Sequence, residues 1–230
     1  MAAPGSRAST GAARPNQREQ AAAEARTRIL AAAADRIVHD GLAQVRMASI
    51  ARTAGVSAGL LHYHFDTKEL LFGEVLKYSH ELSAQLNERA LASAGDGPPE
   101  RLSSFLDRCL PSDQQRADEW LLWQELTLLC VRDPRLAKVG ADLYEDLYAT
   151  VADIVAEGIA RGVFATALDP RFVAETAVSL TDGLGGRVLA GDPNFGIEEA
   201  RTAMVTAVGI LVGHNGPLPP PTQLDGGDAA

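Results

Sequence analysis

The stretch from Ile50 to Leu71, IARTAGVSAGLLHYHFDTKELL, constrains the fold of this 230-residue chain more than any other part of its sequence. Apolar residues at helical spacing lead up to Gly55, the residue type that most easily takes the left-handed backbone that ends a helix. Ser57 follows, and serine is a residue type that caps the start of a helix. Two short helices joined through a glycine turn are typical of a helix-turn-helix, whose second helix enters the major groove of DNA.

The rest of the chain shows the same helical periodicity. Apolar residues recur every three or four positions, and no sustained two-residue alternation indicates a strand. Glycine, proline and capping residues divide this pattern into about nine helices. The predicted ranges are 17–40, 47–54, 58–65, a long helix from 68 that fades by 95, 98–111, 117–131, 135–161, 170–191 and 196–213. The sequence therefore predicts an all-α fold.

Composition divides the chain into four parts. Residues 1–17 are rich in Ala, Gly, Ser, Arg and Pro, and residues 215–230 are rich in Pro and Gly, so we expect a disordered arm and a disordered tail. Between them we expect a helix-turn-helix DNA-binding domain over 18–70 and a larger ligand-binding and dimerisation domain over 71–214. Apolar residues make up 46% of the chain, which is enough for a substantial core.

Three features predict a cytoplasmic protein that does not enter a membrane. No run of the sequence approaches the roughly 20 apolar residues that a membrane-spanning helix needs. The first residues lack the apolar core of a signal peptide. The two cysteines, Cys109 and Cys130, fit a reduced compartment better than a disulfide scaffold.

Charge is distributed unevenly along the chain, whose formal net charge is −9. Residues 1–70 carry nine Lys and Arg side chains against six Asp and Glu, whereas residues 71–230 carry twelve against twenty-four. The basic end can approach phosphates while the acidic remainder is repelled from them. This asymmetry supports DNA binding because it coincides with the helix-turn-helix.

The second helix of this motif, predicted over residues 58–65, has two faces. At about 100° per residue, Leu61 and Phe65 share one face and should pack on the preceding helix. The opposite face carries Gly59, Leu60, His62 and Tyr63. We interpret it as a DNA-contacting face rather than an ordinary solvent-facing patch, because a small domain has no stability reason to expose these side chains.

Residues 26–41 (RTRILAAAADRIVHDG) and 47–71 (MASIARTAGVSAGLLHYHFDTKELL) resemble the N-terminal domain of the TetR family of transcriptional regulators. The family signature is matched without gaps at Gly55, Val56, Ser57, Gly59, Leu61, His64, Phe65, Lys68 and Leu71. The resemblance implies a first helix that braces the helix-turn-helix. It also implies a homodimer that binds a double-stranded, pseudo-palindromic DNA operator as a repressor.

The resemblance assigns DNA-binding roles to Arg46, Ser49, Ser57, Ala58, Gly59, Leu60, His62, Tyr63 and Lys68. Leu60 would face base edges and contact a thymine methyl, and His62 and Tyr63 would bond phosphates or base edges. Lys68, near the start of the fourth helix, would contact the phosphate backbone. His64 and Phe65 would hold the helix in place.

The sequence departs from the family pattern at Arg46, Ala58 and His62, so its operator cannot be inferred from that of other members. Arg46, together with Arg14 and Arg18 of the arm, is an alternative source of contacts to the DNA backbone. Flexible arms of this kind are also often simply solvated.

Residues 120–164 resemble the C-terminal domain of one TetR subgroup, typified by the choline-responsive betaine regulator. The resemblance rests on an aromatic helix, the Arg132-Asp133-Pro134 break and Gly162. It implies an internal pocket formed mostly by the fourth to eighth helices, and a dimer in which the last two helices of two subunits form a four-helix bundle. The apolar residues expected at that interface are Val178, Leu184, Val188, Met204, Val208 and Leu211.

Aromatic or polar residues set among apolar ones are the candidates for lining this pocket: Tyr78, Phe105, Trp120, Trp123, Gln124, Thr127, Tyr144, Tyr148 and Asp182. Each of them alone is more typical of ordinary core or surface. We favour the group of Trp123, Gln124 and Asp182, and two tryptophans in an acidic domain indicate a cationic or aromatic ligand through cation–π contact. Glycines at 183, 185 and 186 would suit either a close helix approach or a ligand cavity.

No catalytic, cofactor or metal motif is found in residues 71–213. His62 and His64 diverge on a helix and do not predict a metal site. Cys109 and Cys130 are better explained as small core residues than as a redox switch. We therefore expect a ligand-responsive regulator without a cofactor and not an enzyme. The alternative is a ligand-independent DNA-binding regulator or architectural protein, and an all-helical enzyme is the least favoured reading.

Overall fold

The computed structural model describes residues 17–221, which form nine α-helices and no strand. The helices are α1 (Gln17–Asp40), α2 (Met47–Thr53), α3 (Ala58–His64), α4 (Lys68–Ser93), α5 (Pro98–Arg108), α6 (Gln114–Arg132), α7 (Pro134–Ala160), α8 (Pro170–Leu189) and α9 (Ile197–Leu211). The predicted all-α fold is confirmed. Within the same range, none of the helices has both the length and the hydropathy of a membrane span.

Capping side chains set the starts of α3, α4 and α6. Ser57 Oγ accepts the backbone N–H of Leu60 at 3.1 Å, and Thr67 Oγ1 accepts that of Leu70 at 3.2 Å. These are the N-cap bonds that replace the missing partners of a helix's first turn. Asp113 caps α6 in the same way, so α6 begins three residues before the predicted start at residue 117.

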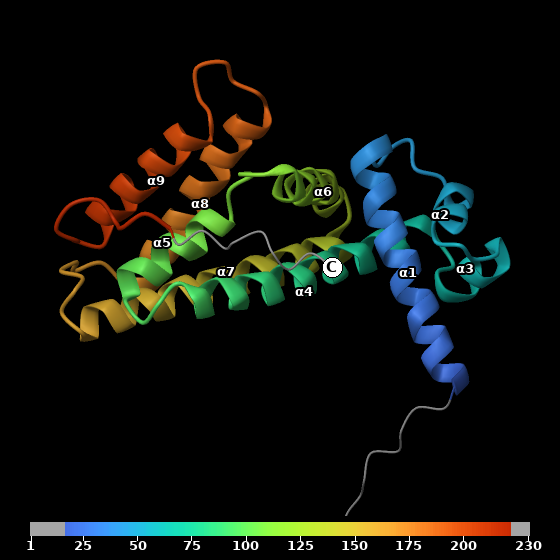
Figure 1. Cartoon of the computed structure of the whole chain (residues 1–230). Helices are drawn as coiled ribbons and strands as arrows, with labels where there is room; N and C mark the ends of the chain where they lie inside the picture. Colours follow the sequence, from blue (N-terminus) through green and yellow to red (C-terminus); the bar gives the residue numbers. More distant parts are fainter. Residues whose placement is uncertain (1–16, 222–230) are drawn as a thin grey trace, which may run out of the picture.

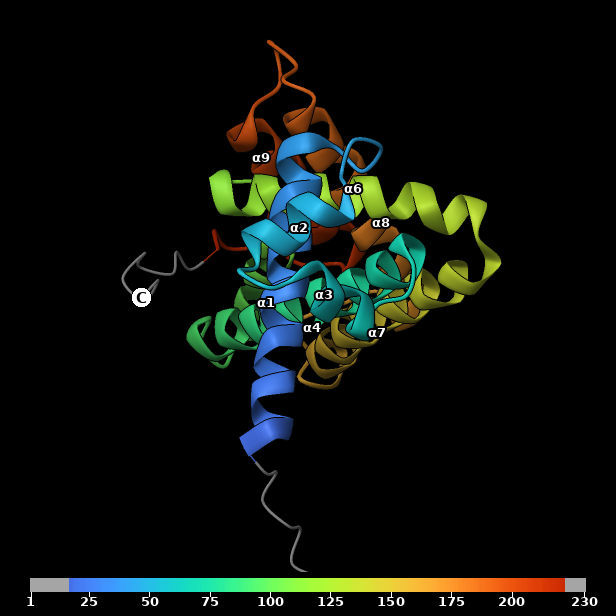
Figure 2. The ribbon, with the colours of Figure 1, turned by 90° about the vertical axis from the view of Figure 1, so that its right-hand side faces the viewer.

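The helices form a small unit at one end of the molecule and a larger bundle at the other (Figure 1). α2 and α3 lie on the side of α1 that faces away from the bundle, and this side faces the viewer in Figure 2. α4 leaves the small unit as a long helix and runs alongside α7, and α8 and α9 pack together at the far end of the bundle. α4 is therefore a continuous link between the two parts.

The buried side chains form two clusters. The first joins α1, α2, α3 and the start of α4 to the larger bundle through Leu122, Leu126 and Leu143. The second lies among α5, α7, α8 and α9 and contains Phe105 and Met204. Because α6 and α7 contribute to the first cluster, the expected boundary between residues 70 and 71 does not separate two independent cores.

Four of the six apolar residues expected at a subunit interface are buried inside the chain, which corrects the prediction for those four. Four are buried and two are half-buried: Val178, Leu184, Met204 and Val208, then Val188 and Leu211. They belong to the second cluster, where α8 packs against α7 and α9. Helical periodicity identifies the apolar face of a helix but not which neighbour covers it. On α8 and α9 themselves, the large apolar side chains that do face outward are Phe172, which is 52% exposed, and Ile210, which is 76% exposed.

Residues 214–221 pack against α9 rather than leaving the bundle. Leu218 is buried, and its backbone N–H donates to the carbonyl of Val205 at 3.0 Å. A Cβ on Gly209 of α9 would lie 2.7 Å from the carbonyl oxygen of Gly216, so the glycine makes room for this segment. The tail expected from residue 215 is therefore corrected as far as residue 221. Residues 222–230, and residues 1–16 of the expected arm with Arg14, lie outside the described residues.

Candidate nucleic-acid interface and ligand cavity

α3 presents one face to the core and another to solvent, as its periodicity predicts. Leu61 and Phe65 are buried in the first cluster, and the guanidinium of Arg26 lies 5.6 Å from the centroid of the Phe65 ring. Tyr63 is 79% exposed and Leu60 is half-buried. The outward-facing positions of α3 and its cap are Ser57, Ala58, Gly59, His62 and Tyr63.

The turn before α3 depends on one glycine and one serine. Gly55 has φ +64, and a Cβ there would meet nothing within 4 Å, so the backbone conformation alone favours glycine. Ser57 Oγ accepts from Leu60, which leaves its own O–H free to donate to a phosphate.

Two predicted phosphate donors are already engaged within the chain. Ser49 Oγ donates its single hydrogen to the carbonyl of Arg46 at 2.7 Å, whereas a phosphate oxygen needs a donor. Lys68 Nζ donates to the carbonyl of Leu42 at 3.1 Å and lies 5.2 Å from the ring centroid of Phe72. Two of the three N–H groups of Lys68 stay available. The side chain of Arg46 is exposed at the start of α2.

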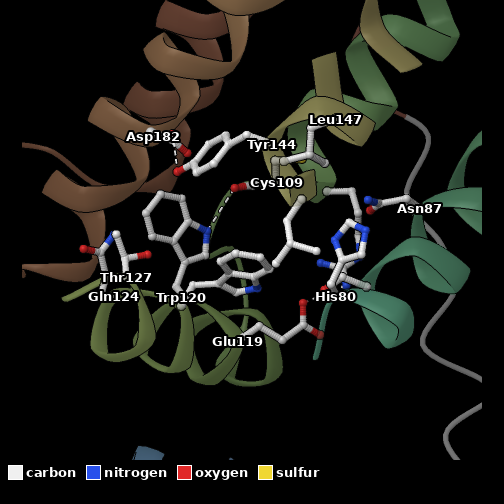
Figure 3. Close-up of a pocket in the computed structure, with 14 residues that line it drawn as sticks. His80, Asn87, Cys109, Glu119, Trp120, Gln124, Thr127, Tyr144, Leu147 and Asp182 are labelled. Atoms are coloured by element: carbon white, nitrogen blue, oxygen red, sulfur yellow. Dashed lines mark hydrogen bonds and ion pairs between the residues drawn. The ribbon is translucent and has the colours of Figure 1, made fainter. Parts of the chain in front are cut away.

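A cavity of about 110 Å³ lies among α4, α5, α6, α7 and α8 (Figure 3). On the same measure one water needs roughly 10–15 Å³, so this cavity has room for a small organic molecule. Six of the nine predicted pocket residues line it: Trp120, Trp123, Gln124, Thr127, Tyr144 and Asp182. The remaining lining residues were not predicted from the sequence: His80, Ser83, Asn87, Arg108, Cys109, Glu119, Leu143 and Leu147.

The other three candidates, Tyr78, Phe105 and Tyr148, do not line this cavity. Tyr78 lines a separate, more open cleft between α1, α4 and α6. Phe105 is buried in the second core cluster. The Tyr148 ring is tilted against that of Tyr144, with centroids 5.8 Å apart, and its centroid lies 4.8 Å from the guanidinium carbon of Arg171. An aromatic residue in an apolar helix is typical of a core as well as of a pocket, so its type alone could not place it.

Trp120 is held in position from two directions. Its indole N–H donates to the backbone carbonyl of Cys109 at 2.9 Å (Figure 3). Its ring packs on α8 at Gly185, where a Cβ would lie 2.4 Å from Trp120 Cζ2. A Cβ at Gly183 or Gly186 would meet nothing within 4 Å. Of the three α8 glycines, Gly185 is the one whose missing side chain shapes the cavity.

Asp182 is an acidic group of the cavity without a basic partner. It accepts a hydrogen bond from the hydroxyl of Tyr144 at 3.0 Å, whereas Glu119 pairs with Arg108 at 2.8 Å. Among residues 17–221, no Arg, Lys or His forms an ion pair with Asp182. Burial raises the pKa of Asp182, an effect that the Tyr144 hydrogen bond opposes. Burial and the nearby Asp182 carboxylate also raise the pKa of Tyr144. A cation beside Asp182 would stabilise its ionised form.

His80 and Trp123 lie at another side of the cavity, on α4 and α6. His80 Nε2 lies 2.8 Å from Asp146 Oδ2. The imidazole of His80 meets the indole of Trp123 edge to face, with the ring centroids 6.5 Å apart. Trp123 also packs against the first core cluster, and Tyr144 packs against the second. The cavity therefore lies where the two cores meet.

Neither cysteine of the described residues is in a disulfide, and burial affects the thiol of Cys109. Cys109 and Cys130 are both free, and burial raises the pKa of Cys109 to about 12. A thiol with so high a pKa is a poor nucleophile at neutral pH. Within residues 17–221, no three His, Cys, Asp or Glu side chains are arranged to hold a metal ion.

Comparison with known proteins finds a matching protein family for each half of the chain. Residues 29–75 match the family described as "Bacterial regulatory proteins, tetR family", and residues 98–212 match "BetI-type transcriptional repressor, C-terminal". The HTH-type transcriptional regulator BetI of Ectopseudomonas mendocina is 27% identical over 180 residues, which cover 76% of this chain and 87% of that protein.

Two solved structures share the fold over most of both chains. A protein from Rhodococcus sp., described as a TetR-family transcriptional regulator, is 28% identical with a TM-score of 0.73 and covers 83% of this chain and 99% of its own. A protein from Saccharomonospora viridis, described as a transcriptional regulator in complex with choline, is 29% identical with a TM-score of 0.74. That match covers 85% of this chain and 98% of the other.

Proposed function

Because the chain belongs to the TetR family of transcriptional regulators and has a BetI-type C-terminal half, we propose that it is a homodimeric repressor released from its operator by a small cationic ligand. In a dimer, two α3 helices related by a two-fold axis would enter successive major grooves of a pseudo-palindromic operator. The ligand would bind in the cavity among α4–α8, and the protein would act in the cytoplasm.

This proposal rests on the Asp182 carboxylate, which lies in an aromatic cavity and has no basic partner within residues 17–221. A quaternary ammonium group has no N–H to donate, so proteins recognise it through the faces of aromatic rings and through nearby negative charge. Trp120, Trp123 and Tyr144 supply the rings and Asp182 supplies the charge. The choline complex of the Saccharomonospora viridis protein supports a quaternary amine as the class of ligand.

The position of the cavity supports control of DNA binding. α4 begins three residues after the C-cap of α3, and its residues His80, Ser83 and Asn87 line the cavity. A ligand that shifts α4 or the junction of the two cores would change the spacing of the two α3 helices in a dimer. To weaken operator affinity a hundredfold, the ligand must favour the non-binding arrangement by about 2.7 kcal/mol.

The outward faces of α8 and α9 are suited to the proposed dimer. Besides the exposed Phe172 and Ile210, small residues lie on these faces and allow helices to approach closely: Gly183 on α8, and Thr202, Ala203, Thr206 and Ala207 on α9. Two copies of this pair would form a four-helix bundle.

Intrinsic fluorescence tests the ligand directly, because the chain has two tryptophans and both line the cavity. Titration with choline should change their emission. Dimethylbutanol, in which a carbon replaces the choline nitrogen, has the same shape without the charge and should bind at least about tenfold more weakly. In parallel, choline should lower the affinity for a duplex from the region upstream of the gene. Equal binding of the two compounds, or choline binding that leaves DNA affinity unchanged, would refute the proposal.

A further inference from the structure

α6 contacts both the ligand cavity and the DNA-binding unit. Trp120 and Trp123 line the cavity, whereas Leu122 and Leu126 of the same helix are buried in the first core with α1, α2 and α3. Figure 1 shows α6 beside α1, on the side of the bundle nearest the small unit. α6 therefore contacts the DNA-binding unit directly, and not only through α4.

One polar side chain of α6 bonds to the turn that leads into the helix-turn-helix. Glu125 Oε2 accepts the backbone N–H of Leu42, in the turn between α1 and α2, at 3.2 Å. Its Oε1 lies 3.6 Å from the position of a Cβ on Gly41, whose φ of +73 favours glycine. The carbonyl of Leu42 accepts from Lys68 of α4 at 3.1 Å. The backbone of Leu42 is thus held from α6 on one side and from α4 on the other.

The turn does not need Glu125 to keep its own shape. Gly41 N–H donates to the carbonyl of Ile37 at 2.9 Å, and Gln44 N–H donates to the carbonyl of Gly41 at 3.0 Å. These local bonds define the turn, whereas the Glu125 bond ties it to a helix 83 residues away in the sequence. A hydrogen bond of this length is lost when its partners move apart by roughly 1 Å.

We propose that Glu125 is a positioning residue that couples α6 to the helix-turn-helix, so that a ligand in the cavity moves the DNA-binding unit through α6. The effect of ligand rests on the proposed function, whereas the mechanical link does not. Trp123 and Gln124, which line the cavity, immediately precede Glu125 on the helix. A small rotation or shift of α6 that accommodates a ligand moves the Glu125 carboxylate as well.

The first test measures duplex affinity with and without choline for the wild type, Glu125→Ala, Glu125→Gln and Glu81→Ala. We expect Glu125→Ala to reduce the ratio of the two affinities at least about fivefold, while its choline affinity by tryptophan fluorescence stays within about twofold. Glu125→Gln should retain the ratio, because the amide oxygen still accepts the Leu42 N–H. Glu81 is an exposed acidic residue of α4, so Glu81→Ala should leave both the affinity ratio and the choline affinity unchanged. An unchanged ratio in Glu125→Ala, or an equal loss in Glu125→Gln, would overturn the coupling.

The second test needs neither ligand nor DNA. Gly185→Ala forces Trp120 to move, because the new Cβ would lie 2.4 Å from its ring, and so it displaces α6 from the cavity side. We expect Gly185→Ala, introduced alone, to speed backbone amide hydrogen exchange in α2. Combined with Glu125→Ala, it should not change the exchange rate of α2. Gly186→Ala, with open space around its Cβ, is the matched control.

The two tests separate the link from the ligand. An effect of Gly185→Ala that is the same in both backgrounds would show that Glu125 does not carry the displacement. An effect confined to the wild-type background, together with no choline response, would retain the link and reject choline as the ligand.

Discussion

The residues that shape the cavity act in pairs that are distant in the sequence. Trp120 approaches α8 because residue 185 has no side chain, and Asp182 is oriented by a hydroxyl from Tyr144 on α7. Viewed alone, one member of each pair would be taken for an ordinary core or surface residue. The chemistry of the site follows from the pairs: a fixed indole face lies beside a half-buried carboxylate that has no cationic partner among the described residues.

Replacing Asp182 by Asn separates its contribution to binding from its contribution to folding. Asparagine keeps an acceptor for Tyr144 but has no charge, so choline affinity should fall about tenfold. The free energy of unfolding without ligand should stay equal or rise, because burial of an unpaired carboxylate destabilises the folded state. Fluorescence titration and urea unfolding check the two effects.

The same residue predicts the pH dependence of binding. Burial raises the pKa of Asp182, so protonation begins at a higher pH than for an exposed aspartate and removes the charge that a cation contacts. Choline affinity of the wild type should therefore fall as pH decreases, and the fall should begin at a higher pH than the ordinary titration of an exposed aspartate would give. The Asp182→Asn variant should lack this slope. The same slope in both proteins would contradict the role of Asp182.

Leu60 and Tyr63 of α3 are predicted to contribute differently to DNA binding. Tyr63→Phe removes a hydroxyl that can bond a phosphate, so it should weaken binding to every duplex by about 1 kcal/mol. Leu60→Ala removes a contact to base edges, so it should change the order of preference among duplexes. Affinities across a panel of single-base variants distinguish the two. A uniform loss for Leu60→Ala would be inconsistent with the orientation of α3.

At the scale of elements, the sequence predicted what is determined locally. α3 was predicted from a glycine turn, a serine cap and a two-sided periodicity, all within ten residues of one another, and the structure confirms its buried and exposed faces. The partners of a helix depend on distant segments. Met204 and Val208 were therefore assigned to a second subunit although their own chain covers them. His80 and Asn87 were missed because polar residues on a long helix are usually solvated.

The N-cap of α4 offers a test of this element, which connects α3 to the cavity. Thr67→Ala removes the acceptor for the Leu70 N–H and should lower the free energy of unfolding by about 1 kcal/mol. Thr150 lies within α7, where its hydroxyl donates to the carbonyl of Asp146. Thr150→Ala should lower the free energy of unfolding by only a few tenths of a kcal/mol, because it removes no helix cap. Urea unfolding of both variants compares them, and equal losses would argue against a capping role for Thr67.

At the scale of the whole molecule, two cores meet at the cavity while α4 and α6 both reach the DNA-binding unit. The acidic bundle, with twenty-four acids over residues 71–230, is kept away from phosphate, and the basic end is directed toward it. The remaining apolar surface on α8 and α9 is at the end of the bundle farthest from α3 (Figure 1). This arrangement suits a dimer that presents two α3 helices to one duplex.

Ile210→Glu tests the proposed dimer surface. Ile210 is 76% exposed on α9, so the substitution should leave the subunit folded but place a charge in the four-helix interface. We expect a shift from dimer to monomer in light scattering after size exclusion. Val131→Glu is the matched control, because Val131 is 79% exposed on α6, outside α8 and α9. A dimer that persists in Ile210→Glu, or dissociates equally in Val131→Glu, would contradict the proposed interface.

The most direct measurement for the whole account is the fluorescence anisotropy of a labelled duplex from the region upstream of the gene, titrated with protein in the presence and absence of choline. We expect binding of one or more dimers, an affinity that falls steeply with salt, and a loss of affinity of about a hundredfold when choline saturates the cavity. Absence of binding at low salt, or an affinity that choline leaves unchanged while it alters tryptophan emission, would contradict this expectation.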